Sequence, residues 1–250
     1  MCCFSRPVES VADTRIYARA AGKGWQFIVY SMSFEATEDL AMILPLPSRE
    51  NLGEAAVEFI NLEQYPKFFD DMHAGFPKPA PRGKAGGFGS LAIDSPLPLK
   101  VVDVGAFEAS FVPTIGDFDR LDARFKLDAE TWDAIPKYKS YGFAVFKLKK
   151  GDHKVHPMAF KFASAIGWRL FFPTVHIHDG KVHREADFDH ELYCQMNDVD
   201  ARHARNWTES IQPAGMFLDK EKLGELIDPD EHCYQRVMKG SLRNIDVLVG

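Results

Sequence analysis

The alternation of apolar and polar positions along the chain predicts a protein built mainly from β-strands. Short runs rich in Ile, Val, Phe and Tyr, bounded by Gly, Pro and polar turns, are typical of strands. Such runs cover residues 15–18, 26–34, 40–46, 101–112, 141–148, 156–162 and 169–177, and an edge strand is expected over 244–249. The MSF run at 32–34 precedes a Leu-Pro pair much as the MAF run at 158–160 precedes a Phe-Pro pair, which suggests two related β-units.

Apolar residues at helical spacing predict several short helices between these strands. They are expected over residues 52–62, 65–72, 117–124, 129–138, 220–227 and 233–238. Residues 76–98 differ, because Pro, Gly and Lys dominate them, and we expect a mobile loop there. The whole chain, residues 1–250, is therefore predicted to form a single α+β domain of mostly antiparallel sheet with short helices packed on one side.

Chemically active side chains concentrate in one stretch, FFPTVHIHDGKVHREADFDHELYC, which holds four of the nine histidines and one of the four cysteines. Its Asp179-Gly180 pair is a strong signal for a two-residue β-hairpin turn. In the simplest register the hairpin places His176, His178 and His183 side by side, because side chains alternate across a strand. Three adjacent imidazoles suit a shared metal ion that keeps one coordination position open for water or substrate.

The hypothesis that follows is a metal-binding protein, most simply a metalloenzyme. His156, His190 and Cys194 are further candidate ligands, and imidazole together with thiolate favours Zn or Cu, while imidazole alone also suits Fe. In a hydrolase, metal-bound water would attack a small-molecule or peptide substrate with Glu185 or Asp189 as the base. In an oxidoreductase, Cu or Fe would activate oxygen instead, and the sequence does not choose between the two. The plain alternative is that the histidines form the solvated side of an amphipathic hairpin.

Two further alternatives belong to other classes of protein. Removal of Met1 would expose Cys2 as an N-terminal residue that combines a thiol nucleophile with an α-amine base, as in N-terminal-nucleophile amidohydrolases. Cys2 and Cys3 could instead supply soft ligands to the histidine site. The last alternative is a non-catalytic domain for metal storage, metal sensing or interaction with other molecules.

Charge and composition limit the class of protein and the cellular compartment that we expect. The formal net charge is -6 at pH 7, which argues against a general nucleic-acid binder, because such proteins normally carry a basic excess. The first residues show no secretory pattern and the sequence shows no membrane-spanning stretch, so we expect a cytoplasmic protein whose cysteines are thiols or metal ligands. The oligomeric state is left open.

Motifs of low specificity extend over about residues 15–173. They are RIY at 15–17, DLAMILPLP at 39–47, VGAFEA at 104–109, YGFAVFKL at 141–148 and PMAF at 157–160. Together they resemble an uncharacterised bacterial family, domain of unknown function 2330. Members of that family often begin with an export signal and a cysteine-rich mature end, and this chain lacks that signal. The resemblance implies no established activity, so the site is argued from its own residues.

Overall fold

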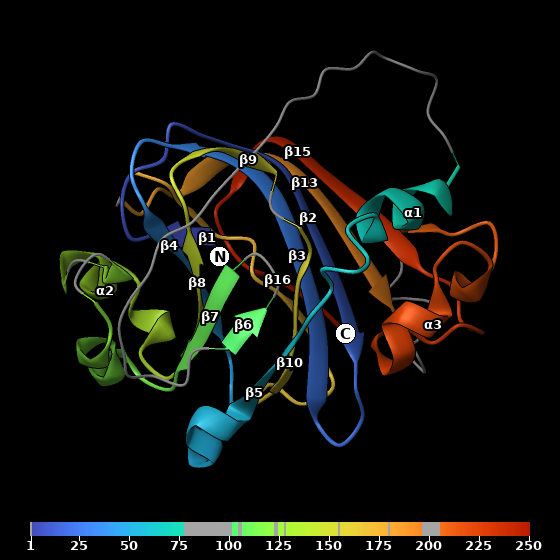
Figure 1. Ribbon diagram of the computed structural model, residues 1–250, viewed down its shortest axis with the longest axis horizontal. Coiled ribbons are helices and arrows are strands. Elements are labelled where there is room, and N and C mark those ends of the chain that lie inside the picture. The colour runs from blue at the N-terminus through green and yellow to red at the C-terminus, as the bar shows by residue number, and fades with distance from the viewer. Residues whose placement is uncertain are drawn as a thin grey trace.

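Two packed β-sheets form the centre of the protein, and short helices lie on their outer faces (Figure 1). The structure is a computed structural model, and it describes residues 2–77, 102–104, 107–122, 125–127, 129–154, 156–179, 181–196 and 206–250. Most neighbouring strands run antiparallel and the helices are few and short, so the predicted α+β class is confirmed. In the described part of the chain, none of the helices combines the length and the apolar character needed to span a membrane.

The first sheet has six strands and includes the start of the chain. In spatial order they are β12 (His176–Ile177), β1 (Cys2–Phe4), β4 (Leu40–Leu46), β8 (Gly142–Leu148), β7 (Phe107–Val112) and β6 (Val102–Val104). β1 runs parallel to β12 and antiparallel to β4, and the remaining pairs are antiparallel. The strand predicted over 40–46 is found as β4 with the same limits.

The second sheet has eight strands and carries most of the long ones. Its main path is β14 (Thr208–Glu209), β15 (Tyr234–Arg243), β13 (Glu185–Gln195), β2 (Ser10–Ala20), β3 (Trp25–Ala36), β10 (Met158–Ala163) and β5 (Val57–Ile60), with β9 (Gly151–Lys154) paired to β3. β13 and β2 are parallel, whereas the other pairs are antiparallel. A separate two-stranded sheet pairs β11 (Leu170–Phe172) with β16 (Val247–Val249).

Alternating side chains divide the core into three layers. Along β3, Ile28 and Tyr30 face the space between the two sheets, whereas Phe27 and Val29 face outward. The outward cluster is covered by α1 (Phe68–Ala74), η5 (Ala214–Met216), α3 (Lys220–Leu223) and η6 (Gly224–Leu226). The outer face of the six-stranded sheet is covered by η2 (Ile115–Arg120), α2 (Ala129–Ala134) and η4 (Pro136–Tyr138). The helices are therefore shared between the two outer faces.

Two segments that were predicted as helices contain β-strands instead. Residues 233–238 lie almost wholly in β15, whose ten residues pair in continuous register with β13. The first part of 52–62 is the 3₁₀ helix η1 (Glu50–Ala56), but its second part contains β5, which pairs with β10. In both segments, pairing with a distant strand outweighs local helix propensity. The loop predicted over 76–98 lies, from residue 78 onward, outside the described residues.

Candidate functional site

The predicted histidine hairpin does not form, because its two arms join different sheets. His176 and Ile177 make up β12, which pairs with β1 at the edge of the six-stranded sheet. The next strand begins only at Glu185 and is β13 of the eight-stranded sheet. Asp179 keeps a local turn contact, since its Oδ1 accepts a hydrogen bond from the Lys181 backbone N–H at 3.0 Å. The chain thus crosses from one sheet to the other between β12 and β13.

Three of the candidate histidines nevertheless meet between the two sheets. The Nε2 atoms of His176 and His190 lie 2.9 Å apart, and the rings of His176 and His178 stack with centroids 4.7 Å apart. Phe188 packs beside them, with its ring centroid 4.5 Å from that of His176. Because His176 belongs to the six-stranded sheet and His190 to the eight-stranded sheet, their contact joins the two sheets directly.

Burial keeps these three rings neutral. Burial, together with a smaller effect of the neighbouring His190, lowers the pKa of His176 to about 2 and that of His178 to about 4. Burial also lowers the pKa of His190. The contact between His176 and His190 therefore joins one Nε2 that donates to one Nε2 that accepts. Among the described residues, the Nε2 of His178 and the Nδ1 of His190 have no hydrogen-bond partner, and Asp189 Oδ1 lies 3.7 Å from that Nδ1.

The remaining candidate ligands lie elsewhere in the molecule. His183 is exposed, and its Nε2 lies 3.0 Å from Asp179 Oδ2. Cys194 is fully buried in the core, where burial raises the pKa of its thiol. The ring of His156 packs on that of Phe107, with centroids 4.0 Å apart. The fold thus brings together three of the six predicted ligands.

The arrangement contradicts the prediction of a metal-binding protein or metalloenzyme. Across the residues that the structure describes, no group of three or more His, Cys, Asp or Glu side chains is placed to hold a metal ion. The physical reason is that the histidine rings pack against each other. The planes of His176 and His178 are inclined by only 19°, and the Nε2 of His176 already bonds to His190. A zinc, copper or iron cofactor therefore stays a prediction that the described residues do not support.

The residues assigned to catalysis are placed by the fold, while their roles stay predictions. Glu185 is exposed at the start of β13, and Asp189 accepts a hydrogen bond from the Asp13 backbone N–H at 2.7 Å. Cys2 begins β1, where its backbone is in register with His176. The side chain of Cys2 lies outside the described part of the structure, so the N-terminal-nucleophile hypothesis also stays a prediction.

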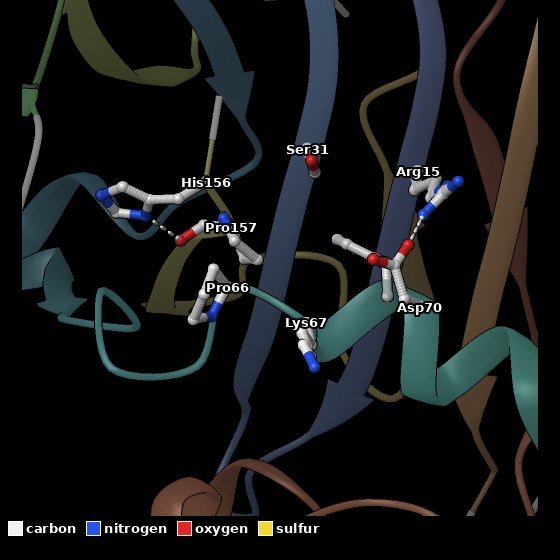
Figure 2. A pocket seen from close by; sticks show the side chains of 8 residues that line it. Arg15, Ser31, Pro66, Lys67, Asp70, His156 and Pro157 are labelled. Carbon is white, nitrogen blue, oxygen red and sulfur yellow. Dashed lines mark hydrogen bonds and ion pairs between the residues drawn. The ribbon is translucent and has the colours of Figure 1, made fainter. Parts of the chain in front are cut away.

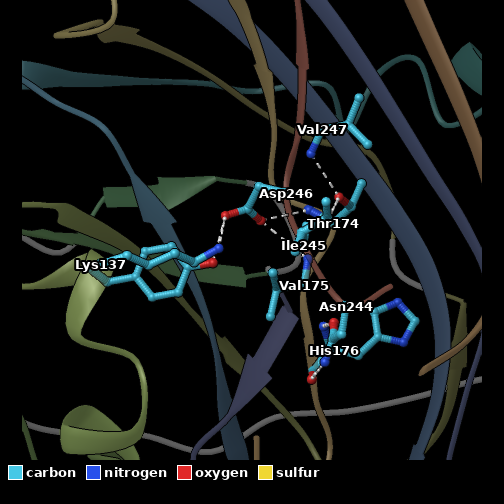
Figure 3. A network of polar contacts seen from close by, with 9 residues as sticks. Lys137, Thr174, Val175, His176, Asn244, Ile245, Asp246 and Val247 are labelled. Carbon is cyan, nitrogen blue, oxygen red and sulfur yellow. Dashed lines mark hydrogen bonds and ion pairs between the residues drawn. The ribbon is translucent and has the colours of Figure 1, made fainter. Parts of the chain in front are cut away.

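Beside the histidines, Asn244 holds the backbone of β12 (Figure 3). Its Oδ1 accepts a hydrogen bond from the His176 N–H at 2.7 Å, and its Nδ2 donates to the His176 carbonyl at 2.8 Å. The same Nδ2 donates to the His183 carbonyl at 3.1 Å. One amide side chain from the segment after β15 therefore fixes the histidine-bearing strand. No sequence motif indicates this role, because Asn244 lies 68 residues from His176.

Asp246 forms the other half of this network and is buried with its charge (Figure 3). Its Oδ1 accepts hydrogen bonds from the N–H groups of Thr174 and Val175 at 3.1 and 3.2 Å. Its Oδ2 accepts from the Tyr138 hydroxyl at 2.5 Å and lies 3.2 Å from the Lys137 ammonium. Burial by itself raises the pKa of Asp246, but Lys137 and these donors outweigh it, so the pKa is lowered and the carboxylate is charged.

An open cavity of about 250 Å³ lies on the outer face of the eight-stranded sheet, beside α1 (Figure 2). Arg15 of β2 and Ser31 of β3 are register partners that line it, and Asp70 Oδ1 accepts a hydrogen bond from Arg15 Nη1 at 2.8 Å. His156 and Pro157 line another side, where His156 Nδ1 lies 3.1 Å from the Pro157 carbonyl oxygen. The charges of Arg15 and Asp70 pair with each other, and the lining also includes the ammonium-bearing Lys67 and the apolar Phe69.

The architecture is that of two mainly antiparallel sheets packed face to face and flanked by short helices. It is similar to the crystal structure of baculovirus P35, with a TM-score of 0.51, 14% sequence identity, and coverage of 100% of this chain and 99% of that chain. Two structures of a mutated P35 after caspase cleavage match with a TM-score of 0.50 each. One shows 12% identity and covers 96% of this chain and 99% of that one; the other shows 15% identity and covers 98% and 99%.

These likenesses establish a shared fold. No protein-family model matches the sequence, and no curated protein matches it either. The resemblance to domain of unknown function 2330 therefore stays a prediction. The expected small-molecule or peptide substrate is corrected at this point, because two of the similar structures are of a mutated P35 after caspase cleavage, which records a protein acting on P35.

Proposed function

We propose that this chain is a protein-binding inhibitor that engages a caspase-type protease. The observation that carries the proposal is the likeness to P35, two structures of which were solved after caspase cleavage. The likeness extends over 100% of this chain, so it includes both sheets and their flanking helices and is wider than a single common motif. The non-catalytic interaction domain, one of the alternatives raised by the sequence, is the one that this proposal develops.

The part of the chain that we expect to meet the protease is residues 78–100, which connect α1 to β6. This connection contains a single acidic residue, Asp94, followed by Ser95. Caspases hydrolyse peptide bonds that follow aspartate, and functional contacts are commonly made by connections that a rigid scaffold holds in place. The two flanks supply such a scaffold, because α1 packs on the eight-stranded sheet and β6 is an edge strand of the six-stranded sheet.

The compartment that we propose for this function is the cytoplasm. Cys3, Cys194 and Cys233 are buried free thiols, which supports a reducing environment.

The test is an inhibition assay with a panel of active caspases and a fluorogenic peptide substrate. We expect the purified chain to slow hydrolysis of the peptide and mass spectrometry to find cleavage between Asp94 and Ser95. Asp94→Ala should abolish both effects. Asp133→Ala, which removes an exposed carboxylate from α2, is the matched control and should behave like the unaltered chain.

Two outcomes would contradict the proposal. One is that the unaltered chain, at micromolar concentration, neither slows any caspase nor forms a complex with it in size-exclusion chromatography. The other is equal inhibition by the unaltered chain and by Asp94→Ala, which would remove residues 78–100 from the contact.

A further inference from the structure

The outer edge of β15 is a long stretch of strand without a neighbour. On its inner side, all ten residues of β15 pair with β13. On its outer side, β14 reaches only Tyr234 and Gln235. Within the described part of the chain, residues 236–243 therefore have no strand beside their outer edge. The backbone N–H and C=O groups along such an edge are a template for pairing with another chain.

The side chains along this edge are basic and largely exposed. The charged residues of β15 are Arg236, Lys239 and Arg243, and the strand carries no acidic residue. None of the three forms an ion pair with another described residue. Val237 lies among them with 59% of its surface exposed, which adds an apolar contact point.

The charges on the neighbouring strand β13 indicate which charge a strand bound to the outer edge of β15 should carry. Glu185 lies opposite Arg243 in the register of the two strands, and Asp189 lies opposite Lys239. Pairs of opposite charge across neighbouring strands are stabilising, and like charges are destabilising. Going outward through the sheet, acidic β13 is followed by basic β15, so the alternation of sign continues if the next strand is acidic.

A second copy of this chain does not meet that requirement. Two β15 edges placed side by side would bring six cations together, since each strand carries Arg236, Lys239 and Arg243. Lysines and arginines on an exposed edge keep identical molecules from joining their sheets. The charge pattern therefore favours a partner of different sequence.

We infer that the outer edge of β15 binds an extended, acidic segment of another protein as an additional β-strand. Main-chain hydrogen bonds to residues 236–243 supply affinity in this mode of binding, and side chains at alternate positions supply specificity. Carboxylates at alternate positions of the segment pair with Lys239 and Arg243, which lie on the same face of β15. This edge is separate from residues 78–100, so the inference does not depend on caspase inhibition.

The probe for this inference is a labelled, N-acetylated peptide of alternating Glu and Val, seven residues long. Fluorescence anisotropy should show that it binds, and amide hydrogen exchange should slow within residues 236–243. The double variant K239E/R243E should weaken binding by about tenfold, because two attractive contacts become repulsive. The control K23E/K139E changes the net charge equally at exposed lysines on other parts of the molecule, and it should change affinity by less than about twofold.

Two control peptides separate strand addition from charge attraction alone. A peptide with Lys in place of Glu should not bind, because its charges repel those of β15. An acidic peptide N-methylated at every second residue lacks half of the donors for strand pairing and should bind weakly. Equal binding of the methylated and unmethylated peptides overturns the inference, as does slowed exchange at another strand or no binding of the acidic peptide at millimolar concentration.

Discussion

Two polar groups buried side by side in this protein are stabilised in opposite ways. His176 and His190 are neutral, and the Nδ1 of His190 has no hydrogen-bond partner among the described residues. Asp246 is charged, and two backbone N–H groups, a hydroxyl and an ammonium surround its carboxylate. The difference teaches that a neutral ring can be buried with a missing partner, whereas a buried charge requires nearly complete compensation.

The largest effect should come from removing the buried charge. Asp246→Ala leaves the Lys137 ammonium, the Tyr138 hydroxyl and the N–H groups of Thr174 and Val175 without their acceptor. We expect the free energy of unfolding to fall by about 2–4 kcal/mol, because the buried N–H groups and the hydroxyl lose their acceptor, while the half-exposed Lys137 ammonium can turn to water. Urea denaturation followed by circular dichroism measures it.

The control for this prediction is Asp133→Ala in α2, where the carboxylate is 82% exposed. We expect it to change the free energy of unfolding by about 0.5 kcal/mol or less. Similar losses for the two variants would mean that the network around Asp246 contributes no more than a surface carboxylate.

The second prediction is that the buried histidines and Asp246 change the stability of the protein in different pH ranges. The unfolded chain protonates its histidines near the ordinary pKa of 6.5, whereas the fold keeps His176 and His178 neutral down to about 2 and about 4. Unfolding therefore takes up protons, so stability falls as the pH falls. Between pH 6.5 and 5.5, the loss should be about 1 kcal/mol for each of His176 and His178, and His190, whose pKa is also lowered, adds to the loss in the same direction. Urea midpoints at a series of pH values measure it.

Asp246 is charged in the folded protein, whereas the histidines are neutral. Its contribution to stability therefore changes in a different pH range. Its pKa is lowered from 3.8, so the stability that it contributes is present above that value and is lost only as the pH falls below it. His178→Phe should remove one of the three histidine contributions and leave the loss below pH 4 in place. An unchanged slope between pH 6.5 and 5.5 in His178→Phe would show that this ring is not held neutral by the fold.

The smallest effect should come from the exposed histidine. His183 and Asp179 form a contact of 3.0 Å, but their side chains are 56% and 55% exposed. Exposed ion pairs contribute about 0.2–1 kcal/mol, so His183→Ala should lower the free energy of unfolding by about 0.5 kcal/mol or less at pH 6. A loss as large as that of Asp246→Ala would remove the distinction between buried and exposed polar groups. Urea denaturation at pH 6 measures the losses in free energy of unfolding for His183→Ala and Asp246→Ala.

The strands that could be predicted are those indicated by a local pattern of apolar and polar residues. Apolar runs located β4 with its limits, β7 and β8 of the same sheet, and β2, β3 and β10 of the eight-stranded sheet, because alternation within one strand is visible without knowledge of its neighbours. The ten residues of β15 were missed for the converse reason. Their Met, Lys and Arg content suits a helix, and the deciding contact is with β13, about fifty residues earlier in the chain.

The candidate site shows the same limit. His176 and His190 were both expected at a site, but the expected geometry was a hairpin, and the structure brings them together across two sheets. Asn244 and Asp246 were not expected at all. Their partners lie 61 to 109 residues away in the sequence, and an Asn or Asp in a tail carries no local sign of such contacts.

The position of β1 and β2 has a consequence for how the chain is made. Both strands belong to the first twenty residues, yet β1 lies between β4 and β12, and β2 lies between β3 and β13. On the ribosome, Cys2 can pair with His176 only after residue 176 has emerged, and Arg15, which can pair early with Ser31, meets its second partner Glu191 only after residue 191 has emerged. Pairings between such distant residues form slowly and leave strand edges open in the meantime. A nascent chain that stalls before residue 176 would therefore hold two unpaired edges, which makes it a client for chaperones.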